Sequence, residues 1–247
     1  MALPYLPGLA NSHNGNYVLQ AIVRFGTRLQ QTQIWLSACP QLFVMCADPY
    51  GSRVVHTMLD FLPSNGADLE YIAFSISNCL SSNFSYFFKR SSGVRVITKC
   101  LRKLNHPCMK FLYNDIVSHC FEMATDQNGA LLLQACISIA ISHSEHERNL
   151  LLRRLVAKTR LLSDNPYGNY VVQCILDLQR DLITKDIVQQ LKGKVNKLAR
   201  QKYGSNVIEK AHCLRVAGQC DRQILIAELL QMDVSEGLSH NYANYCV

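Results

Sequence analysis

One short motif recurs along the chain at nearly even spacing, and it constrains the fold more than any other sequence feature. Each copy begins with glycine, or alanine in the last copy, and carries an apolar pair at its fourth and fifth positions. The copies are GNYVLQ (15–20), GSRVVH (51–56), GVRVIT (93–98), GALLLQ (129–134), GNYVVQ (168–173), GSNVIE (204–209) and ANYCV (243–247). Their first residues lie 36, 42, 36, 39, 36 and 39 positions apart. This period predicts a solenoid, whose units bury their apolar faces only by stacking.

The segment around the fifth copy indicates what one period contains. The stretch 149–161 places its leucines on one stripe and its basic residues largely elsewhere, which predicts an amphipathic helix. SDNPYG (163–168) is typical of a turn with capping residues and a proline suited to a helix start. A second helix is predicted through Leu178, and DPYG (48–51) and DQNG (126–129) repeat the start signal. The repeat is interpreted as helix, turn, helix, and the array as all-α.

The second helix of each repeat has two chemically different faces. At about 100° per residue, Asn169, Tyr170 and Gln173 fall within one arc, and the valine pair of the motif falls on the opposite arc. The pair stays apolar in every copy, so we expect it to be buried. The second, third and sixth motif positions vary while staying mostly polar or aromatic. In a solenoid these triplets would form one continuous ladder along a single face.

The side chains of this ladder suit the recognition of nucleic-acid bases. Asn and Gln each carry a donor and an acceptor, so an Asn…Gln pair can read a pyrimidine edge. A Ser…Glu pair adds a carboxylate, which accepts two N–H groups, and guanine is the base whose Watson–Crick edge donates two. Tyr or Arg at the third position can stack on bases. One base read by two or three side chains of each helical repeat is a known mode of RNA recognition.

Composition excludes several other classes of protein. The chain of 247 residues has a net charge of +7 with only 17% charged residues, which argues against disorder and suggests an anionic partner. The N-terminus lacks the basic and apolar regions of a signal peptide, and no apolar run is long enough for a membrane span. The 11 cysteines form no C-x-x-C pair and are interpreted as reduced core residues. His212, Cys213 and Cys220 match no zinc pattern, and no catalytic motif supports an enzyme.

The sequence resembles the PUF (Pumilio) family over essentially its whole length. The resemblance rests on NPYGNYVVQCIL (165–176), KYGSNVIEKAHC (202–213) and NYANYCV (241–247), whose order of Asn-Tyr…Gln, Ser-Asn…Glu and Asn-Tyr is the family's UGU reader. It implies a right-handed curved α-solenoid of about seven repeats with single-stranded RNA on its concave face, running antiparallel to the protein. It further implies a monomeric, cytoplasmic protein without cofactor that binds mRNA 3′ untranslated regions, with protein co-repressors, and represses translation or promotes decay.

The resemblance also implies a role for the triplet residues. The first, fifth and seventh copies are expected to read U, the sixth G, the fourth A and the second A, whereas Val94 and Thr98 depart from the code and leave the third copy tolerant of any base. Ala130 and Leu131 weaken the fourth reader. The residues expected to contact RNA are Asn16, Tyr17, Gln20, Ser52, Arg53, His56, Arg95, Gln134, Asn169, Tyr170, Gln173, Ser205, Asn206, Glu209, Asn244 and Tyr245.

Residues 1–247 are taken as one Pumilio homology domain that is truncated at both ends, because family members usually carry eight repeats. The residues Lys89, Arg90, Lys99, Arg102 and Lys103 are read as one charge cluster on a solvated face. Because the second, third and fourth triplets are degenerate, the rival hypothesis is an α-solenoid that serves as a protein-interaction scaffold with little RNA affinity.

Overall fold

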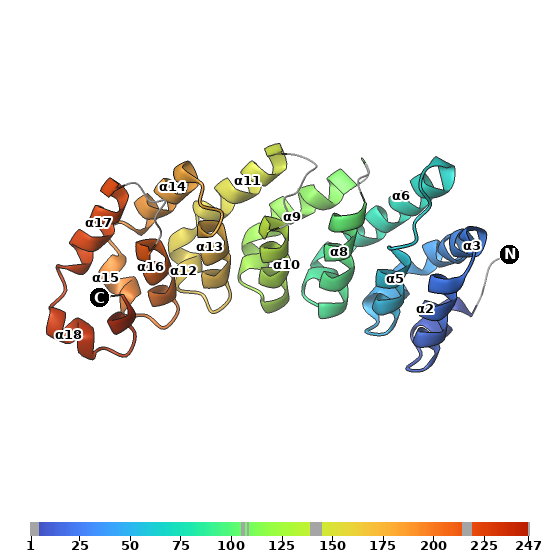
Figure 1. Cartoon of the computed structure of the whole chain (residues 1–247), viewed down its shortest axis with the longest axis horizontal. Helices are drawn as coiled ribbons and strands as arrows, with labels where there is room; N and C mark the ends of the chain where they lie inside the picture. The colour runs from blue at the N-terminus through green and yellow to red at the C-terminus, as the bar shows by residue number, and fades with distance from the viewer. Residues whose placement is uncertain (1–4, 105–106, 108, 139–144, 214–218, 247) are drawn as a thin grey trace. The chain divides into compact units, whose positions relative to one another are not determined.

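A computed structural model describes the chain except for residues 1–4, 105–106, 108, 139–144, 214–218 and 247 (Figure 1). The described residues form α-helices and short 3₁₀ helices and contain no β-strand. They divide into two compact units, residues 1–118 and 119–247, and the boundary falls inside one helix. None of the described helices is both long and apolar enough to cross a membrane.

Unit 1 contains the first three motif copies, on α2, α5 and α8, and these three helices pack in order against one another. A second row of helices, α3 and α6, lies beside them (Figure 1). The elements of unit 1 are α1 (Leu6–Ala10), α2 (Gly15–Phe25), α3 (Arg28–Ala38), η1 (Cys39–Gln41), α4 (Leu42–Ala47), α5 (Gly51–Met58), α6 (Gly66–Ser82), α7 (Phe84–Phe88), α8 (Ser91–Lys103) and the first part of α9 (Met109–Ala124).

Unit 2 repeats the same arrangement. The fourth, fifth and sixth copies lie on α10, α13 and α16, which pack in order, while α11, α14 and α17 form the second row (Figure 1). After the end of α9, its elements are α10 (Gln127–Ser138), α11 (Glu145–Val156), α12 (Thr159–Ser163), α13 (Gly168–Leu176), α14 (Asp181–Leu191), α15 (Val195–Ala199), α16 (Gly204–Cys213), α17 (Gln219–Leu229), α18 (Val234–Ser239) and η2 (Ala243–Tyr245).

Most repeats contain three helices, so the two-helix interpretation was wrong in detail. The stretch 149–161 is split into α11 and α12 rather than forming one helix. The Thr159 hydroxyl donates to the Val156 carbonyl at 2.7 Å, and a continuous helix would give that carbonyl to a backbone amide. The equivalent short helices α4, α7 and α15 precede the motif in the second, third and sixth copies.

The motif glycine lets each motif helix approach the preceding short helix closely. A Cβ atom added at Gly168 would lie 2.8 Å from the Leu162 carbonyl oxygen, and one at Gly204 would lie 2.6 Å from that of Leu198. Such contacts are too short for a side chain, so glycine is required by packing. The predicted start signal is confirmed, because Asn165 Oδ1 accepts from the Gly168 amide at 2.9 Å.

The apolar pair of the motif forms the core between the two helix rows, as predicted for Val54, Val55, Val171 and Val172, which are at most 1% exposed. Val18 in the first copy is an exception at 53% exposure. No described helix packs on the side of α2 that carries Val18, so this position contradicts the expectation that the pair is buried in every copy.

Candidate nucleic-acid interface

The triplet positions have a constant pattern of exposure on the best-formed motif helices. We call the second, third and sixth motif positions the reading triplet. Asn16 and Asn169, at the second position, are 0% exposed, whereas Tyr17 and Tyr170, at the third, are 58% and 54% exposed. The sixth-position glutamines are intermediate. The first and fifth triplets therefore each present one flat, accessible ring beside a recessed polar pair.

In the fifth copy the recessed pair is held in one orientation. Asn169 Nδ2 donates to the carbonyl oxygens of Asn165 and Pro166 at 2.9 and 3.0 Å. The opposite orientation of the amide would place Asn169 Oδ1 against both carbonyl oxygens and is therefore unfavourable. Gln173 Nε2 donates to Asn169 Oδ1 at 3.1 Å. No described residue donates to Gln173 Oε1. The pair thus presents to solvent the Gln173 acceptor and the second N–H of the same amide, which together match the donor and acceptor of a base edge.

The sixth copy places a carboxylate beside this pair. Ser205 is buried, with its hydroxyl 3.5 Å from the Lys202 carbonyl oxygen, whereas Glu209 is exposed and accepts no hydrogen bond from a described residue. An open groove of about 400 Å³ is lined by residues of both copies, namely Tyr170, Gln173, Asn206, Glu209 and Lys210. The groove therefore combines an aromatic face, an amide and a free carboxylate within reach of one or two bases.

The first copy repeats the Asn–Gln bond of the fifth. Asn16 Nδ2 donates to the carbonyl oxygens of Ser12 and His13 at 2.9 and 2.6 Å, and Gln20 Nε2 donates to Asn16 Oδ1 at 3.0 Å. The surroundings differ, because Thr57 Oγ1 donates to Gln20 Oε1 at 3.0 Å. The same triplet thus has a different set of open polar atoms.

The second and third copies are linked to each other by Arg95. Its Nη1 lies 3.3 Å from Ser52 Oγ and 3.4 Å from the Pro49 carbonyl oxygen, and Ser52 Oγ in turn donates to that carbonyl at 3.1 Å. Ser52 is 0% exposed, so the hydroxyl predicted to read a base is already engaged. Arg53, by contrast, is exposed and lies 5.7 Å from the centre of the Tyr50 ring.

His56 replaces the sixth-position glutamine of the second copy. Burial, followed by the positive charge of Lys99 and the smaller effects of Arg95 and Arg102, lowers the pKa of His56 below its ordinary value, against the opposing effect of Asp60. At neutral pH the ring is therefore uncharged and offers one donor and one acceptor, as the amide of glutamine does.

The fourth and seventh triplets are the least complete. Ala130 is buried and offers no polar atom, Leu131 is 55% exposed, and Gln134 Nε2 donates to the Ala130 carbonyl at 3.2 Å. In the seventh copy Tyr245 is 66% exposed like the other tyrosines, but Asn244 is exposed whereas Asn16 and Asn169 are buried. The 3₁₀ helix η2 ends at Tyr245, so the turn that recesses Asn169 has no counterpart there.

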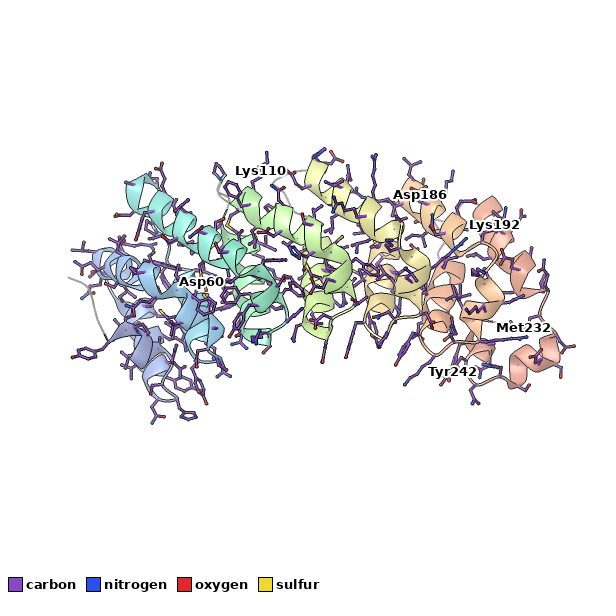
Figure 2. All side chains as sticks on the ribbon, turned by 180° about the vertical axis from the view of Figure 1, so that it is seen from behind. Asp60, Lys110, Asp186, Lys192, Met232 and Tyr242 are labelled. Carbon is purple, nitrogen blue, oxygen red and sulfur yellow. The ribbon has the colours of Figure 1, made fainter. Side chains whose placement is uncertain are left out.

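The predicted charge cluster is two separate groups. Lys89 and Arg90 precede α8, and Arg90 lies 3.7 Å from the centre of the Tyr86 ring. Lys99 and Lys103, near the other end of α8, pair with Asp60 at 2.8 and 3.0 Å. Asp60 is labelled in Figure 2. Nine to fourteen residues separate members of the two groups, which corresponds to about 14–21 Å along a helix axis. The expectation of one cluster was wrong.

The sequence interpretation missed a second row of contacts one residue beyond the triplet. Side chains at the seventh motif position reach the preceding motif helix of the same unit or the two residues after its end: Thr57 contacts Gln20, Lys99 contacts Asp60, Cys174 contacts Ser138 and Lys210 contacts Asp177. The last two distances are 3.6 and 2.6 Å. A recurrent residue directly after each triplet was visible in the sequence, but its variable chemistry hid the common role.

The described residues contain no group of His, Cys, Asp and Glu side chains arranged to hold a metal ion. The side chains of His212, Cys213 and Cys220, considered above for zinc, lie outside the described residues. Cysteines of the described core are free thiols, and burial raises the pKa of Cys136 to about 12, which suppresses its reactivity.

Comparison with known proteins matches these features to one family. A family profile described as "Pumilio-family RNA binding repeat" matches residues 8–35, 41–65, 119–140, 163–191 and 194–230, which is more than half of the chain. Pumilio homolog 12 of Arabidopsis thaliana is 31% identical over 99% of this chain, and a Pumilio domain-containing protein of Schizosaccharomyces pombe is 28% identical over 99%. The chain spans 40% and 34% of these two relatives.

Solved structures match over almost the entire chain. The Puf4 RNA-binding domain bound to the HO endonuclease RNA 3′ UTR recognition sequence superposes with a TM-score of 0.80 at 25% identity, covering 98% of this chain and 74% of that one. A Puf4 mutant bound to the Cox17 RNA 3′ UTR recognition sequence gives a TM-score of 0.83 at 27% identity, with coverage of 98% and 79%. The all-α solenoid fold predicted from the sequence is confirmed.

Proposed function

Because the chain belongs to the Pumilio family of RNA-binding repeat proteins, we propose that it reads single-stranded RNA sites beginning with UGU. The observation that carries the proposal is the groove between the fifth and sixth copies, where Gln173 and Glu209 present unoccupied polar atoms beside Tyr170. Guanine donates its N1–H and N2–H groups to a carboxylate, and uracil offers a donor flanked by acceptors to an amide.

The RNA runs antiparallel to the protein in this proposal. Glu209 then reads G at the second base, Gln173 and Asn169 read U at the third, and Tyr245 with Asn244 contacts the first. Tyr170 and its equivalents stack on bases. The remaining copies extend the site to 5′-UGUANAU-3′, where N is any base, and the chain acts as one domain over residues 1–247.

A binding titration tests this assignment directly. The purified chain is titrated with 5′-UGUAAAU-3′ and with the same RNA carrying UCU in place of UGU. We expect weaker binding to the UCU RNA, because cytosine offers only one amino group to the Glu209 carboxylate. Equal affinities would refute the proposal, and selection from a random RNA pool gives the preferred sequence without any assumption.

The cellular role that we infer is regulation of mRNA through 3′ untranslated regions in the cytoplasm, by translational repression or decay, acting as a monomer with protein co-repressors. Support comes from the similar Puf4 structures, which are bound to RNA 3′ UTR recognition sequences. Crosslinking in cells followed by RNA sequencing tests it, and an absence of enrichment for 3′ untranslated regions would contradict it.

A protein scaffold is the second candidate function. It is favoured by the second and fourth triplets, where Ser52 is already engaged by Arg95 and Ala130 offers no polar atom. Partners that are captured after ribonuclease treatment, combined with no measurable affinity for the UGU RNA, would support the scaffold over the RNA reader.

A further inference from the structure

The first and fifth copies carry the identical triplet Asn-Tyr…Gln, but their glutamines have different partners. Gln173 Oε1 accepts no hydrogen bond from a described residue. Gln20 Oε1 accepts one from Thr57 Oγ1 at 3.0 Å and a second from Arg24 Nη2 at 3.4 Å. In both copies the amide nitrogen donates to the recessed asparagine, so the difference is confined to the acceptor.

The packing of α5 against α2 positions Thr57 for its contact with Gln20. It occupies the seventh motif position of the second copy on α5, which packs directly against α2, and it is 6% exposed. Its β-branched side chain has few rotamers, so the hydroxyl stays directed at the glutamine. Arg24, on the same helix as Gln20, is exposed and its longer contact is the weaker of the two.

Occupation of Oε1 changes what the first triplet offers to a base. An amide oxygen has two lone pairs, and both are used here. The open group is the second N–H of Gln20, because the Oδ1 atom of fully buried Asn16 already accepts a hydrogen bond from Gln20 Nε2. Uracil needs an acceptor for its N3–H group, whereas cytosine carries an acceptor at N3. A triplet that offers hydrogen-bond donors but no free acceptor therefore does not prefer uracil over cytosine.

We propose that Thr57 is a specificity-determining residue, which makes the first triplet tolerant of C as well as U at the last base of the site, although the fifth triplet, with the same three residues, selects U. The inference rests on the proposed RNA-reading function. In this proposal, a residue of the second copy, and not the triplet residues themselves, causes the difference in selectivity between the first and fifth triplets.

Among the described residues, the other copies direct the seventh position elsewhere. Lys99 and Lys210 form ion pairs with Asp60 and Asp177, and Cys174 Sγ lies 3.9 Å from the backbone oxygen of Gln134. Thr57 alone in this set contacts the side-chain amide of a reading glutamine. The first copy is therefore the place where the effect is expected.

The experiment measures the affinity of the chain and its variants for three RNAs by fluorescence anisotropy. The RNAs are 5′-UGUAAAU-3′, the same with C at the last base, and the same with C at the third base. For the unsubstituted chain we expect the change at the last base to weaken binding by less than about 2-fold. The change at the third base is expected to weaken it by about 10-fold, the upper range of one net hydrogen bond.

Thr57→Val removes the hydroxyl and keeps the shape of the side chain. It is expected to increase the preference for U over C at the last base by about 3-fold to 10-fold, and to leave the preference at the third base unchanged. Thr57→Ser retains the hydroxyl and should behave as the unsubstituted chain. Cys174→Val, at the equivalent position of the fifth copy, is the matched control and should change neither preference.

Lys210→Thr provides an independent test in the other direction. It places a hydroxyl at the seventh position beside Gln173 and is expected to reduce selectivity for U at the third base, whereas Asp177→Asn, which only breaks the ion pair, should not. The inference is overturned if Thr57→Val leaves the last-base preference unchanged while the UGU and UCU RNAs are still distinguished. If those two RNAs bind equally, the proposed function itself fails.

Discussion

The reading triplets of the two units differ in how many of their polar atoms are already used. In unit 2, Gln173 and Glu209 keep acceptors that no described residue occupies. In unit 1, Thr57 donates to Gln20 and Arg95 donates to the Ser52 hydroxyl. Outside the triplets of unit 1, Asp60 forms ion pairs with Lys99 and Lys103. The third-position tyrosines, by contrast, are about equally exposed in both.

This difference separates base stacking from base selectivity, two properties that one triplet would be expected to supply together. Stacking depends on an exposed ring, and both units supply one. Selectivity depends on unoccupied donors and acceptors, because a group already paired within the protein must break that bond before it binds a base. We therefore expect base selectivity to be concentrated in unit 2 and affinity to be shared.

Glu209→Gln is the substitution expected to have the largest effect. It replaces one carboxylate acceptor by an amide N–H, so one of the two guanine donors loses its partner. The preference for G at the second base should fall by about 1–3 kcal/mol, measured as the ratio of affinities for RNAs with G and A there. Asp186→Asn on α14 removes the same charge outside the groove and is the control (Figure 2). Retained preference for G would contradict the assignment.

Tyr170→Ala tests stacking and is expected to cost about 1 kcal/mol of binding free energy, whatever base is present. Tyr17→Ala should cost about the same, because the two rings are equally exposed. Calorimetric titration of each variant with the UGU RNA measures both losses, and Leu182→Ala, an exposed apolar residue of α14, is the control. A much smaller loss for Tyr17 would show that stacking, too, is confined to unit 2.

Asp60→Asn tests whether the paired lysines of unit 1 are available to RNA. Burial would raise the pKa of Asp60, but hydrogen bonds from Lys99 and Lys103 lower it overall, so the carboxylate is charged at neutral pH. Its removal should cost less than about 1 kcal/mol of stability. Affinity should rise about 2-fold to 3-fold, and the slope of log affinity against log salt should steepen by about 0.7 for each lysine that gains a phosphate.

Asp177→Asn is the equivalent change in unit 2 and frees one lysine, Lys210, instead of two. The smaller gain expected there makes it the internal comparison. An unchanged salt slope in both variants would mean that these lysines stay away from the phosphates.

The smallest effect is expected from His56→Gln and appears only at low pH. The pKa of folded His56 is below its ordinary value, so protons bind the unfolded chain more readily. Above the pKa of His56 in the unfolded chain, the stability does not depend on this residue. Stability is lost as the pH falls from that pKa toward the lower pKa of His56 in the folded chain. The melting temperature of the unsubstituted chain should therefore fall relative to that of His56→Gln between pH 7 and pH 5. A constant difference would show that His56 is not buried among these cations.

Several features of the fold were predictable because they repeat. Several repeats begin with a similar start signal, as Asn165 before Gly168 shows, and contain an apolar pair such as Val171–Val172. These features depend on neighbouring residues only, so they recur with the period of the sequence. The split between α11 and α12 was not predictable from periodicity, since it coincides with a side-chain bond from the Thr159 hydroxyl to the Val156 carbonyl that a periodic pattern does not report. The exposure of Val18 was not predictable either, because the motif does not indicate whether a neighbouring helix covers that position.

The sequence by itself determined the all-α repeat, the position of every reading triplet, and the residue types that suit RNA bases. It did so because helix periodicity, glycine at a close contact and apolar pairing act over a few residues. Only the tertiary structure decided which of those polar groups remain open. Gln20 and Gln173 are indistinguishable within their motifs, and their difference comes from Thr57, 37 residues away in the chain and 3.0 Å away in space. Hydrogen-bond partners across packed helices depend on the docking of whole repeats, which no short motif encodes.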